Sequence, residues 1–266
     1  MKNTQIISVI NQKGGVGKTT TVINLATALS FQNKKILIID LDPQGNASTG
    51  FGIPNNANEK TIYDVLNGNC TFVESIQNTN ISNLKIVSSN VDLSGLEVET
   101  ASENRRAFLL KDKMEEFINS NQNDFSYIFI DCPPSLSLLT VMALVVAKSL
   151  IVPLQAEFFA LEGLSQLIKT IDRIKIKLNP ELSIRGVLLT MFDKRNKLSG
   201  QVDSEARKFF NNKVYQTVIP RNVRLSEAPS HGTPVLIYDK SCSGSKSYLS
   251  FTEEFLKQEH IMESAA

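Results

Sequence analysis

Short runs of Ile, Leu and Val alternate along the chain with longer segments whose apolar residues recur at helical spacing. The short runs lack a strict alternation of apolar and polar positions, which is typical of strands buried on both faces of a parallel sheet. They predict strands at residues 5–10, 35–40, 84–87, 127–131, 149–153, 184–191 and 214–219. The helical spacing predicts helices at residues 18–31, 103–119, 161–178 and 245–258, and another helix between the strands at 127–131 and 149–153.

Strands and helices that alternate in this way predict an α/β fold: a doubly wound, mostly parallel sheet with helices on both faces. The chain has 266 residues, of which 42% are apolar. This size and composition fit one large domain with a sizeable core, so residues 1–266 are predicted to form a single domain. Residues 50–60 are loop-like, and residues 259–266 are predicted to form a flexible acidic tail.

The overall charge excludes a strongly basic protein. Lys plus Arg total 28 and Asp plus Glu total 27, so any nucleic-acid binding would need positive charge gathered locally. The 3 cysteines form no CxxC pair and no metal-ligand spacing, which favours reduced thiols. No signal-peptide pattern opens the chain, and no run reaches the roughly 18 apolar residues that span a bilayer. We therefore expect a cytoplasmic protein.

The clearest chemistry lies between the first predicted strand and the first predicted helix. The stretch departs from the strict G-x-x-x-x-G-K-[ST] phosphate-loop pattern, because Gln12 occupies the first glycine position. Its glycines still let backbone N–H groups turn inward around an anion, and the start of the helix adds its positive dipole end. The residues predicted to bind ATP here are Lys13, Gly14, Gly15, Val16, Gly17, Lys18, Thr19 and Thr20.

Four side chains of this loop have distinct expected roles. Lys18, a predicted catalytic residue, reaches the β- and γ-phosphates. Thr19 ligates Mg²⁺ through its hydroxyl, and Thr20 contacts the α-phosphate. Lys13 is unusual, because a second lysine cannot easily share one phosphate chain with Lys18. Either Lys13 points out of its own loop toward the nucleotide of a second subunit, or it is a solvated loop lysine.

Aspartates end two of the predicted strands. Asp131 ends the strand at 127–131, which is the expected context of a magnesium-binding Walker B aspartate. Asp40 and Asp42 follow the strand at 35–40 and project toward the crevice where nucleotides bind in such sheets. We assign Asp42 to the attacking water and Asp40 to the outer shell of Mg²⁺. The alternative for this pair is an ordinary turn with Asp-Pro chemistry.

Taken together, five segments resemble the deviant Walker A ATPases. They are KGGVGKTT at 13–20, DLDPQGN at 40–46, IDCPPS at 130–135, QAEFFALEG at 155–163 and PRNVRLSEAPS at 220–230. The last segment narrows the resemblance to the ParA/Soj family of chromosome and plasmid partitioning ATPases. The resemblance extends from residue 6 to about residue 256, and its motifs are long and specific.

The resemblance implies a switch that depends on Mg²⁺ and ATP, in which ATP joins two subunits into a nucleotide-sandwich homodimer. Lys13 matches the lysine that crosses to the partner's nucleotide, which makes it a predicted catalytic residue. Gly14 matches a position of close approach between the two loops, and Asp42 matches the hydrolytic, catalytic aspartate. Pro220 and Asn222 match the segment that contacts the adenine.

The resemblance also implies two macromolecular partners. The ATP dimer of such proteins binds double-stranded DNA without sequence preference, on the nucleoid, and a ParB-type centromere-binding protein stimulates hydrolysis and releases it. Arg195 and Arg224 match positions that contribute to DNA contact. Their neighbours Lys194, Lys197 and Arg221 are added as DNA-binding candidates because they lie in the same two basic stretches. No membrane partner is expected.

Three other functions compete with this one. A MinD-like ATPase that binds membrane needs a basic amphipathic terminal helix, but residues 252–259 are mostly acidic. An iron–sulfur carrier on the same fold needs cysteines that meet across a dimer, and Cys132 stands alone in its motif. An interaction protein with an inactive site is disfavoured by Lys18, Thr19 and Asp42, which are all present.

Overall fold

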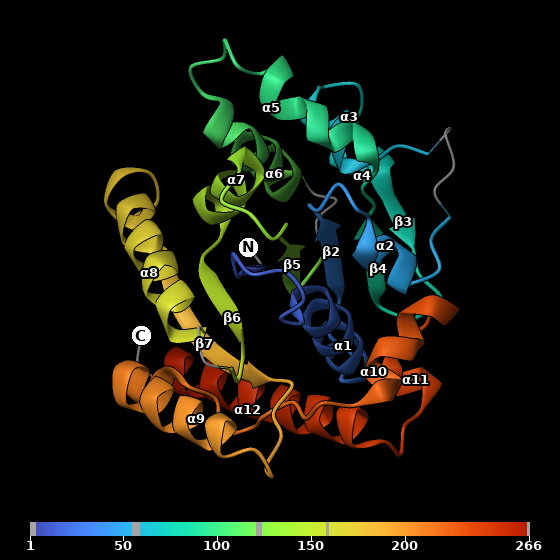
Figure 1. Cartoon of the computed structure of the whole chain (residues 1–266). Coiled ribbons are helices and arrows are strands. Elements are labelled where there is room, and N and C mark those ends of the chain that lie inside the picture. The colour runs from blue at the N-terminus through green and yellow to red at the C-terminus, as the bar shows by residue number, and fades with distance from the viewer. Residues whose placement is uncertain (1–3, 55–58, 121–123, 158–159, 265–266) are drawn as a thin grey trace.

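A seven-stranded sheet in the order β3-β4-β2-β5-β1-β6-β7 forms the centre of the computed structural model (Figure 1). The structure describes residues 4–54, 59–120, 124–157 and 160–264. All neighbouring strands run parallel except β3, which pairs antiparallel with β4 at one edge. The strands are β1 (Gln5–Val9), β2 (Ile36–Asp40), β3 (Ile76–Asn78), β4 (Leu84–Val87), β5 (Tyr127–Asp131), β6 (Ser149–Gln155) and β7 (Ser183–Thr190).

Helices connect the strands and cover both faces of the sheet (Figure 1). The α-helices are α1 (Lys18–Phe31), α2 (Asn46–Gly50), α3 (Ile62–Leu66), α4 (Phe72–Ser75), α5 (Leu96–Glu99), α6 (Leu109–Asn119), α7 (Leu138–Val146), α8 (Ala160–Lys177), α9 (Lys197–Phe210), α10 (Val223–Glu227), α11 (Val235–Tyr238) and α12 (Ser243–Ser264). The 3-10 turns are η1 (Val91–Gly95), η2 (Arg106–Phe108), η3 (Asn211–Lys213) and η4 (Ala228–His231).

Two apolar cores lie on opposite faces of the sheet. Successive strand residues point to opposite sides, so Leu37 packs in one core and its neighbour Ile38 in the other. The first core takes in apolar residues of α6, α7 and α8, and the second takes in those of α1 and α12. Every residue of β2 and β5 is buried, which is why their sequences show no polar alternation. The doubly wound α/β fold is confirmed.

The long elements match their predicted positions closely. The helix predicted at 18–31 and the strands predicted at 84–87 and 127–131 are observed with those bounds. The helix predicted at 103–119 begins later, because residues 106–108 form a 3-10 turn and α6 starts at Leu109. The elements that were not predicted are the short edge strand β3, helix α9 and the short helices α2, α3, α4, α5, α10 and α11. Lys197, which we placed in a basic loop, is the first residue of α9.

The strand predicted at 214–219 is wrong. Beside β7, this segment has an isolated bridge between Val187 and Val214, and its Ile219 N–H donates to the Leu189 carbonyl of β7 at 2.8 Å. The Glu254 carboxylate of α12 accepts hydrogen bonds from the backbone N–H groups of Gln216 at 2.6 Å and Thr217 at 2.9 Å. Those two donors therefore bond to a helix, and a continuous ladder with β7 does not form.

The C-terminal helix is longer than its sequence pattern predicts. Helix α12 reaches Ser264, so most of the segment expected as a flexible tail is helical in the structure. Tyr248, Phe251 and Phe255 anchor the helix in the core, and the Tyr127 hydroxyl donates a hydrogen bond to Glu259. This contact extends the anchored helix into the predicted tail. Within the described part of the chain, no helix combines the length and apolar character needed to cross a bilayer.

Candidate functional site

The phosphate loop links the end of β1 to the start of α1. Gly15 and Gly17 have φ angles of 73° and 90°, in the left-handed region that glycine adopts without steric cost. The Thr190 hydroxyl at the end of β7 donates to the Val16 carbonyl at 2.8 Å and so ties the loop to the neighbouring strand. The loop therefore has the glycine conformations of an anion-binding turn at a helix N-terminus.

A cleft opens over this loop and consists of two adjoining cavities, which we call the phosphate cavity and the base cavity. The phosphate cavity measures about 420 Å³ and the base cavity about 290 Å³. Both are lined by Gly17, Thr20, Met191 and Pro229, so they adjoin. The phosphate cavity is also lined by Gly14, Gly15, Lys18, Thr19, Ile23, Asp42, Asn46, Thr49, Pro134 and Ser230.

The base cavity includes the two residues predicted to contact adenine. Pro220 and Asn222 line it together with Tyr248 and Leu225. Asn222 caps α10 by accepting the Arg224 N–H at 2.8 Å, and its side-chain amide donates to the Ser243 hydroxyl at 2.8 Å. The cavity thus joins a proline, apolar groups and a hydrogen-bonding amide, which is the composition expected around a planar heterocycle.

Lys18 lies at the floor of the phosphate cavity. Its ammonium donates a hydrogen bond to the Lys13 carbonyl at 3.1 Å, and only 6% of the residue is exposed. Burial lowers the pKa of Lys18, while Asp131, Cys132 and Asp42 oppose that shift. The lysine is therefore held inside the loop by one backbone carbonyl, and it lines the phosphate cavity.

Asp131 is the most conspicuous acidic group of the site. It is fully buried, and in the described residues neither carboxylate oxygen accepts a hydrogen bond of ordinary geometry. Burial raises the pKa of Asp131 well above its ordinary value, and the neighbouring Asp40 and Asp42 raise it further. The Thr19 hydroxyl and the Lys18 ammonium act in the opposite direction. A buried carboxylate without a partner is costly unless a cation or a proton compensates its charge.

These groups fit a magnesium ion. The unpartnered Asp131 oxygens and the nearby Thr19 hydroxyl are the hard oxygen ligands that Mg²⁺ prefers. The described residues contain no group of three or more His, Cys, Asp or Glu side chains arranged to hold a metal by themselves. Mg²⁺ usually keeps several waters and binds through one or two protein groups together with substrate phosphates.

Asp42 and Asp40 stand at the end of β2 but face different surroundings. Asp42 lines the phosphate cavity, and its Oδ1 accepts the Gln44 N–H at 3.0 Å. Asp40 is fully buried, and its Oδ2 accepts both the N–H and the hydroxyl of Ser48, at 2.8 and 2.7 Å. Burial raises the pKa of Asp40 to about 6, against the lowering effect of the Ser48 hydrogen bonds. Its predicted place in the magnesium shell stays a prediction, because both oxygens are directed at donors of the chain.

Ser48 is a site residue that the sequence reasoning missed. It belongs to no phosphate-loop or Walker B motif, and its relation to Asp40 appears only when α2 folds back over the end of β2. The one available signal was the run of small polar residues that follows Gly45, which we did not interpret.

Lys13 points away from the phosphate cavity of its own chain. Its ammonium forms an ion pair with Glu157, which follows β6, and its side chain is 49% exposed. The structure thus places Lys13 at the rim of the cleft, where it is paired but accessible.

The five predicted DNA-contacting residues form what we call the basic rim: Lys194, Arg195, Lys197, Arg221 and Arg224. The Arg221 N–H donates to the Phe192 carbonyl at 3.3 Å, which brings the two basic stretches together. Arg195 forms an ion pair with Asp193. Among the described residues, Lys194, Lys197 and Arg221 make no side-chain ion pair.

Arg224 is the more strongly paired arginine of the basic rim. It contacts Glu227 at 2.8 Å and Asp239 at 3.5 Å. Hydrogen bonding to Glu227 raises the pKa of Arg224, so the group stays a cation, but two carboxylates already offset its charge. The rim residues with the least internal compensation are therefore the two lysines and Arg221.

Comparisons with known proteins agree with this geometry. The model of the AAA domain family AAA_31 matches residues 4–184. The chromosome partitioning protein ParA of Caulobacter vibrioides is 50% identical over 262 residues, which cover 98% of this chain and 97% of that protein. The sporulation initiation inhibitor protein Soj of Bacillus subtilis is 46% identical over 250 residues, covering 94% of this chain and 97% of that protein.

A solved structure extends the comparison to the site. The cobyrinic acid a,c-diamide synthase of Mycobacterium smegmatis, crystallised with an ATP analogue and magnesium, superposes with a TM-score of 0.84 at 31% identity. The match covers 96% of this chain and 94% of that one. Together with the relatives above, this match shows the family: the chain belongs to the ParA/Soj family of P-loop ATPases.

Proposed function

We propose that this protein is an ATP-dependent DNA-partitioning switch: Mg²⁺ and ATP drive two copies into a nucleotide-sandwich dimer that binds DNA non-specifically, and hydrolysis releases it. The observation that carries the proposal is the cleft, in which a phosphate cavity and a base cavity adjoin over one glycine-rich loop. A role in chromosome or plasmid partitioning is supported by the names of relatives: a chromosome partitioning protein ParA, a chromosome-partitioning ATPase Soj and a putative plasmid partition protein.

In this proposal, the residues of the cleft divide the work of hydrolysis. Lys18 and the loop N–H groups bind the β- and γ-phosphates and stabilise the charge that develops on them. Thr19 and Asp131 hold Mg²⁺, which neutralises phosphate charge when it is bound. Asp42, whose second oxygen is not taken up by the Gln44 N–H, orients the attacking water.

Dimerisation would bring Lys13 into contact with the nucleotide of the partner subunit. Its half-exposed ammonium is bound to Glu157 in the single subunit and lies outside the phosphate cavity of its own chain. In the sandwich, Lys13 would exchange the Glu157 carboxylate for phosphate oxygens of the partner's nucleotide. A surface ion pair of this kind contributes about 0–1 kcal/mol, so the exchange is energetically modest.

DNA binding would depend on pairing two basic rims. One near-neutral subunit offers few uncompensated cations, because Arg195 and Arg224 are already paired with carboxylates of the chain. Two rims on one dimer double the number of phosphate contacts, and the affinity rises steeply with that number. ATP would therefore gate DNA binding through the oligomeric state, and a ParB-type partner would accelerate hydrolysis. The protein would then be cytoplasmic and located on the nucleoid.

A mobility-shift assay with non-specific double-stranded DNA tests the proposal. The full chain is compared with ATP, with ADP and without nucleotide, in the presence of Mg²⁺. We expect a shift with ATP and little shift otherwise. Flotation with anionic lipid vesicles is the companion measurement. Vesicle binding with ATP and no DNA shift would instead support the MinD-like alternative.

A further inference from the structure

A hydroxyl that lies outside every recognised motif connects three elements behind the cleft. Ser48 stands in α2, and both its backbone N–H and its hydroxyl donate to Oδ2 of Asp40, at 2.8 and 2.7 Å. Asp40 in turn accepts the Asp42 N–H on its other oxygen, Oδ1, at 3.3 Å. The Asp42 backbone is thus connected to Ser48 through one buried carboxylate.

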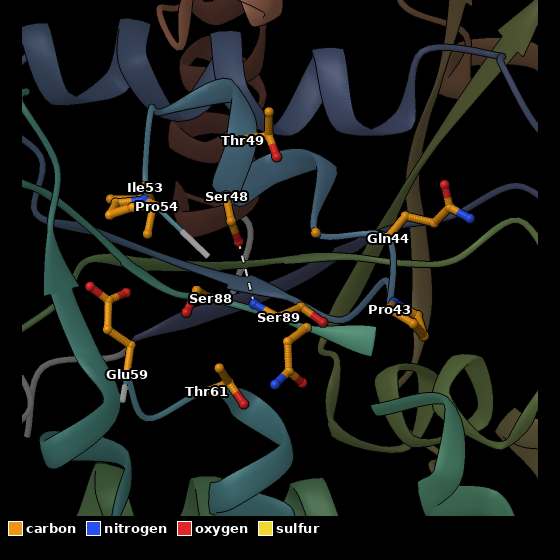
Figure 2. Close-up of a pocket in the computed structure, with 12 residues that line it drawn as sticks. Pro43, Gln44, Ser48, Thr49, Ile53, Pro54, Glu59, Thr61, Ser88 and Ser89 are labelled. Carbon is orange, nitrogen blue, oxygen red and sulfur yellow. Dashed lines mark hydrogen bonds between the residues drawn. The ribbon is translucent and has the colours of Figure 1, made fainter. Parts of the chain in front are cut away.

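The Ser48 hydroxyl forms a further hydrogen bond besides the one to Asp40. Its hydroxyl oxygen accepts the backbone N–H of Ser89, just beyond β4, at 3.3 Å (Figure 2). Ser48 therefore links α2, the end of β2 and the end of β4 through one oxygen. Asp40 is fully buried and Ser48 is 5% exposed, and low local polarity strengthens such hydrogen bonds.

We propose that Ser48 is a positioning residue for ATP hydrolysis: it holds Asp40, and Asp40 holds the Asp42 N–H, which sets where the Asp42 carboxylate meets the attacking water. The inference rests on the proposed ATPase function. In this account Asp40 serves the backbone of Asp42 and does not enter the magnesium shell. Ser48 does not touch phosphate, since the phosphate cavity is lined by its neighbour Thr49.

A small cavity beside Ser48 makes the idea testable by substitution. It measures about 50 Å³ and is lined by Ser48 together with Thr49, Thr61, Ser88 and Ser89 among others (Figure 2). This space exceeds what one water-sized group needs, so an added methyl group can be accommodated. Ser48→Thr therefore keeps the hydroxyl without forcing α2 away from β2.

The same cavity supplies a matched control. Ser88 lines it, and both serines are 5% exposed. The Ser88 hydroxyl, however, accepts a hydrogen bond from the Gln77 side chain at 2.9 Å and has no bond to Asp40. Ser88→Ala thus removes an equally buried serine hydroxyl without disturbing the connection to Asp42.

The experiment measures steady-state ATP hydrolysis, ATP affinity and melting temperature for the full chain and its variants with Mg²⁺. For Ser48→Ala we expect kcat to fall by about ten- to a hundredfold, because a displaced catalytic group is that costly. ATP affinity stays within about twofold of the parent, since Ser48 does not contact phosphate. Ser48→Thr recovers most of the rate, and Ser88→Ala keeps the parent kcat even where its melting temperature falls.

Ser48→Cys covers the case in which the alanine variant fails to fold, because it preserves the volume and offers only a weak donor. It is expected to behave like Ser48→Ala. Asp40→Asn should also lower kcat, because its amide nitrogen cannot accept an N–H group. An unchanged kcat in Ser48→Ala and Ser48→Cys overturns the inference, and so does an equal loss in Ser88→Ala. If the parent chain itself does not hydrolyse ATP, the proposed function fails with it.

Discussion

The nucleotide cleft and the basic rim both depend on charged side chains, but the fold holds these charges in opposite ways. In the cleft, Lys18 and Asp131 are buried at the ends of adjoining elements, and within the described part of the chain no hydrogen bond of ordinary geometry reaches the Asp131 oxygens. On the rim, Arg195 and Arg224 are exposed, and carboxylates of the same chain already contact them. The cleft is therefore organised for a ligand in advance, whereas the rim must exchange internal ion pairs for external ones.

This difference predicts the size of mutational effects. Loss of a buried charge that binds phosphate removes an interaction that no solvent can replace, and the effect is large. Loss of an exposed, paired charge removes an interaction worth about 0–1 kcal/mol, and the effect becomes visible only when many such charges act together.

The largest expected effect comes from Lys18→Ala. Without its ammonium, the phosphate cavity keeps the loop N–H groups but loses its only buried cation among the described residues. We expect hydrolysis to fall by about a hundredfold or more, together with ATP affinity. Isothermal titration and a phosphate-release assay measure both. Lys34→Ala, just beyond α1, should behave like the parent. Normal hydrolysis in Lys18→Ala would place the nucleotide elsewhere.

Asp42→Ala should separate binding from chemistry. Its carboxylate lines the phosphate cavity but is assigned to the water, so we expect kcat to drop by about 10²- to 10³-fold while ATP still binds. Gel filtration with ATP should then detect a lasting dimer. If ATP affinity is lost in parallel with kcat, the assignment of Asp42 to the water is incorrect.

A weaker effect is expected from the double substitution Arg195→Ala and Arg224→Ala. It should reduce DNA affinity without changing ATP hydrolysis, and the slope of log K against log salt should shrink by about one for each phosphate that is no longer bound. Arg105→Ala is the matched control, because Arg105 is also exposed and paired, with Asp112, and it lies outside the basic rim. Parent-like DNA binding by the double variant at moderate salt would show that this rim is not the DNA face.

Because Asp193 pairs with Arg195 of the basic rim, a substitution of this aspartate is predicted to raise DNA affinity. Asp193→Asn releases Arg195 and removes a negative charge from the rim, so DNA affinity should rise by about two- to fivefold. Asp112→Asn removes the same charge from the Arg105 pair and should leave DNA affinity unchanged. Fluorescence anisotropy at fixed salt compares the two variants. Equal affinities would mean that Asp193 does not restrain Arg195.

The smallest effect should follow Glu157→Gln. This change frees Lys13 from its partner, so the ATP concentration needed for dimerisation should fall by up to about fivefold. Light scattering during an ATP titration measures the midpoint. A midpoint that rises would mean that Glu157 supports the dimer and does not compete for Lys13.

More of the cleft than of the basic rim could be predicted from the sequence. The cleft residues lie directly after strands, and the apolar pattern shows where these strands end. The chemistry of Lys18 and Asp131 depends on local order: a glycine-rich turn before a helix, and a carboxylate closing a buried strand. Ser48 escaped notice because its contact with Asp40 arises from the way α2 folds back. The ion pair of Glu157 with Lys13 likewise joins loops that are distant in the sequence, and no spacing rule predicts such a contact.

In the fold, too, elements with a strong sequence pattern of their own were predicted, whereas an element determined by a tertiary contact was not. Long buried strands and α1 were predicted because each has a strong pattern of its own. The segment 214–219 has the composition of a strand, but Glu254 of α12 binds two of its N–H groups. Which backbone N–H groups Glu254 of the distant helix α12 binds depends on the tertiary structure, and the composition of the segment does not predict it.

The central claim is that the nucleotide in the cleft controls the basic rim. Its most direct test is the DNA affinity of Asp42→Ala, measured by anisotropy at one salt concentration with Mg²⁺ and either ATP or ADP. The account predicts binding at least about tenfold tighter with ATP, because only ATP pairs two rims on one dimer. Equal affinity with the two nucleotides would contradict it.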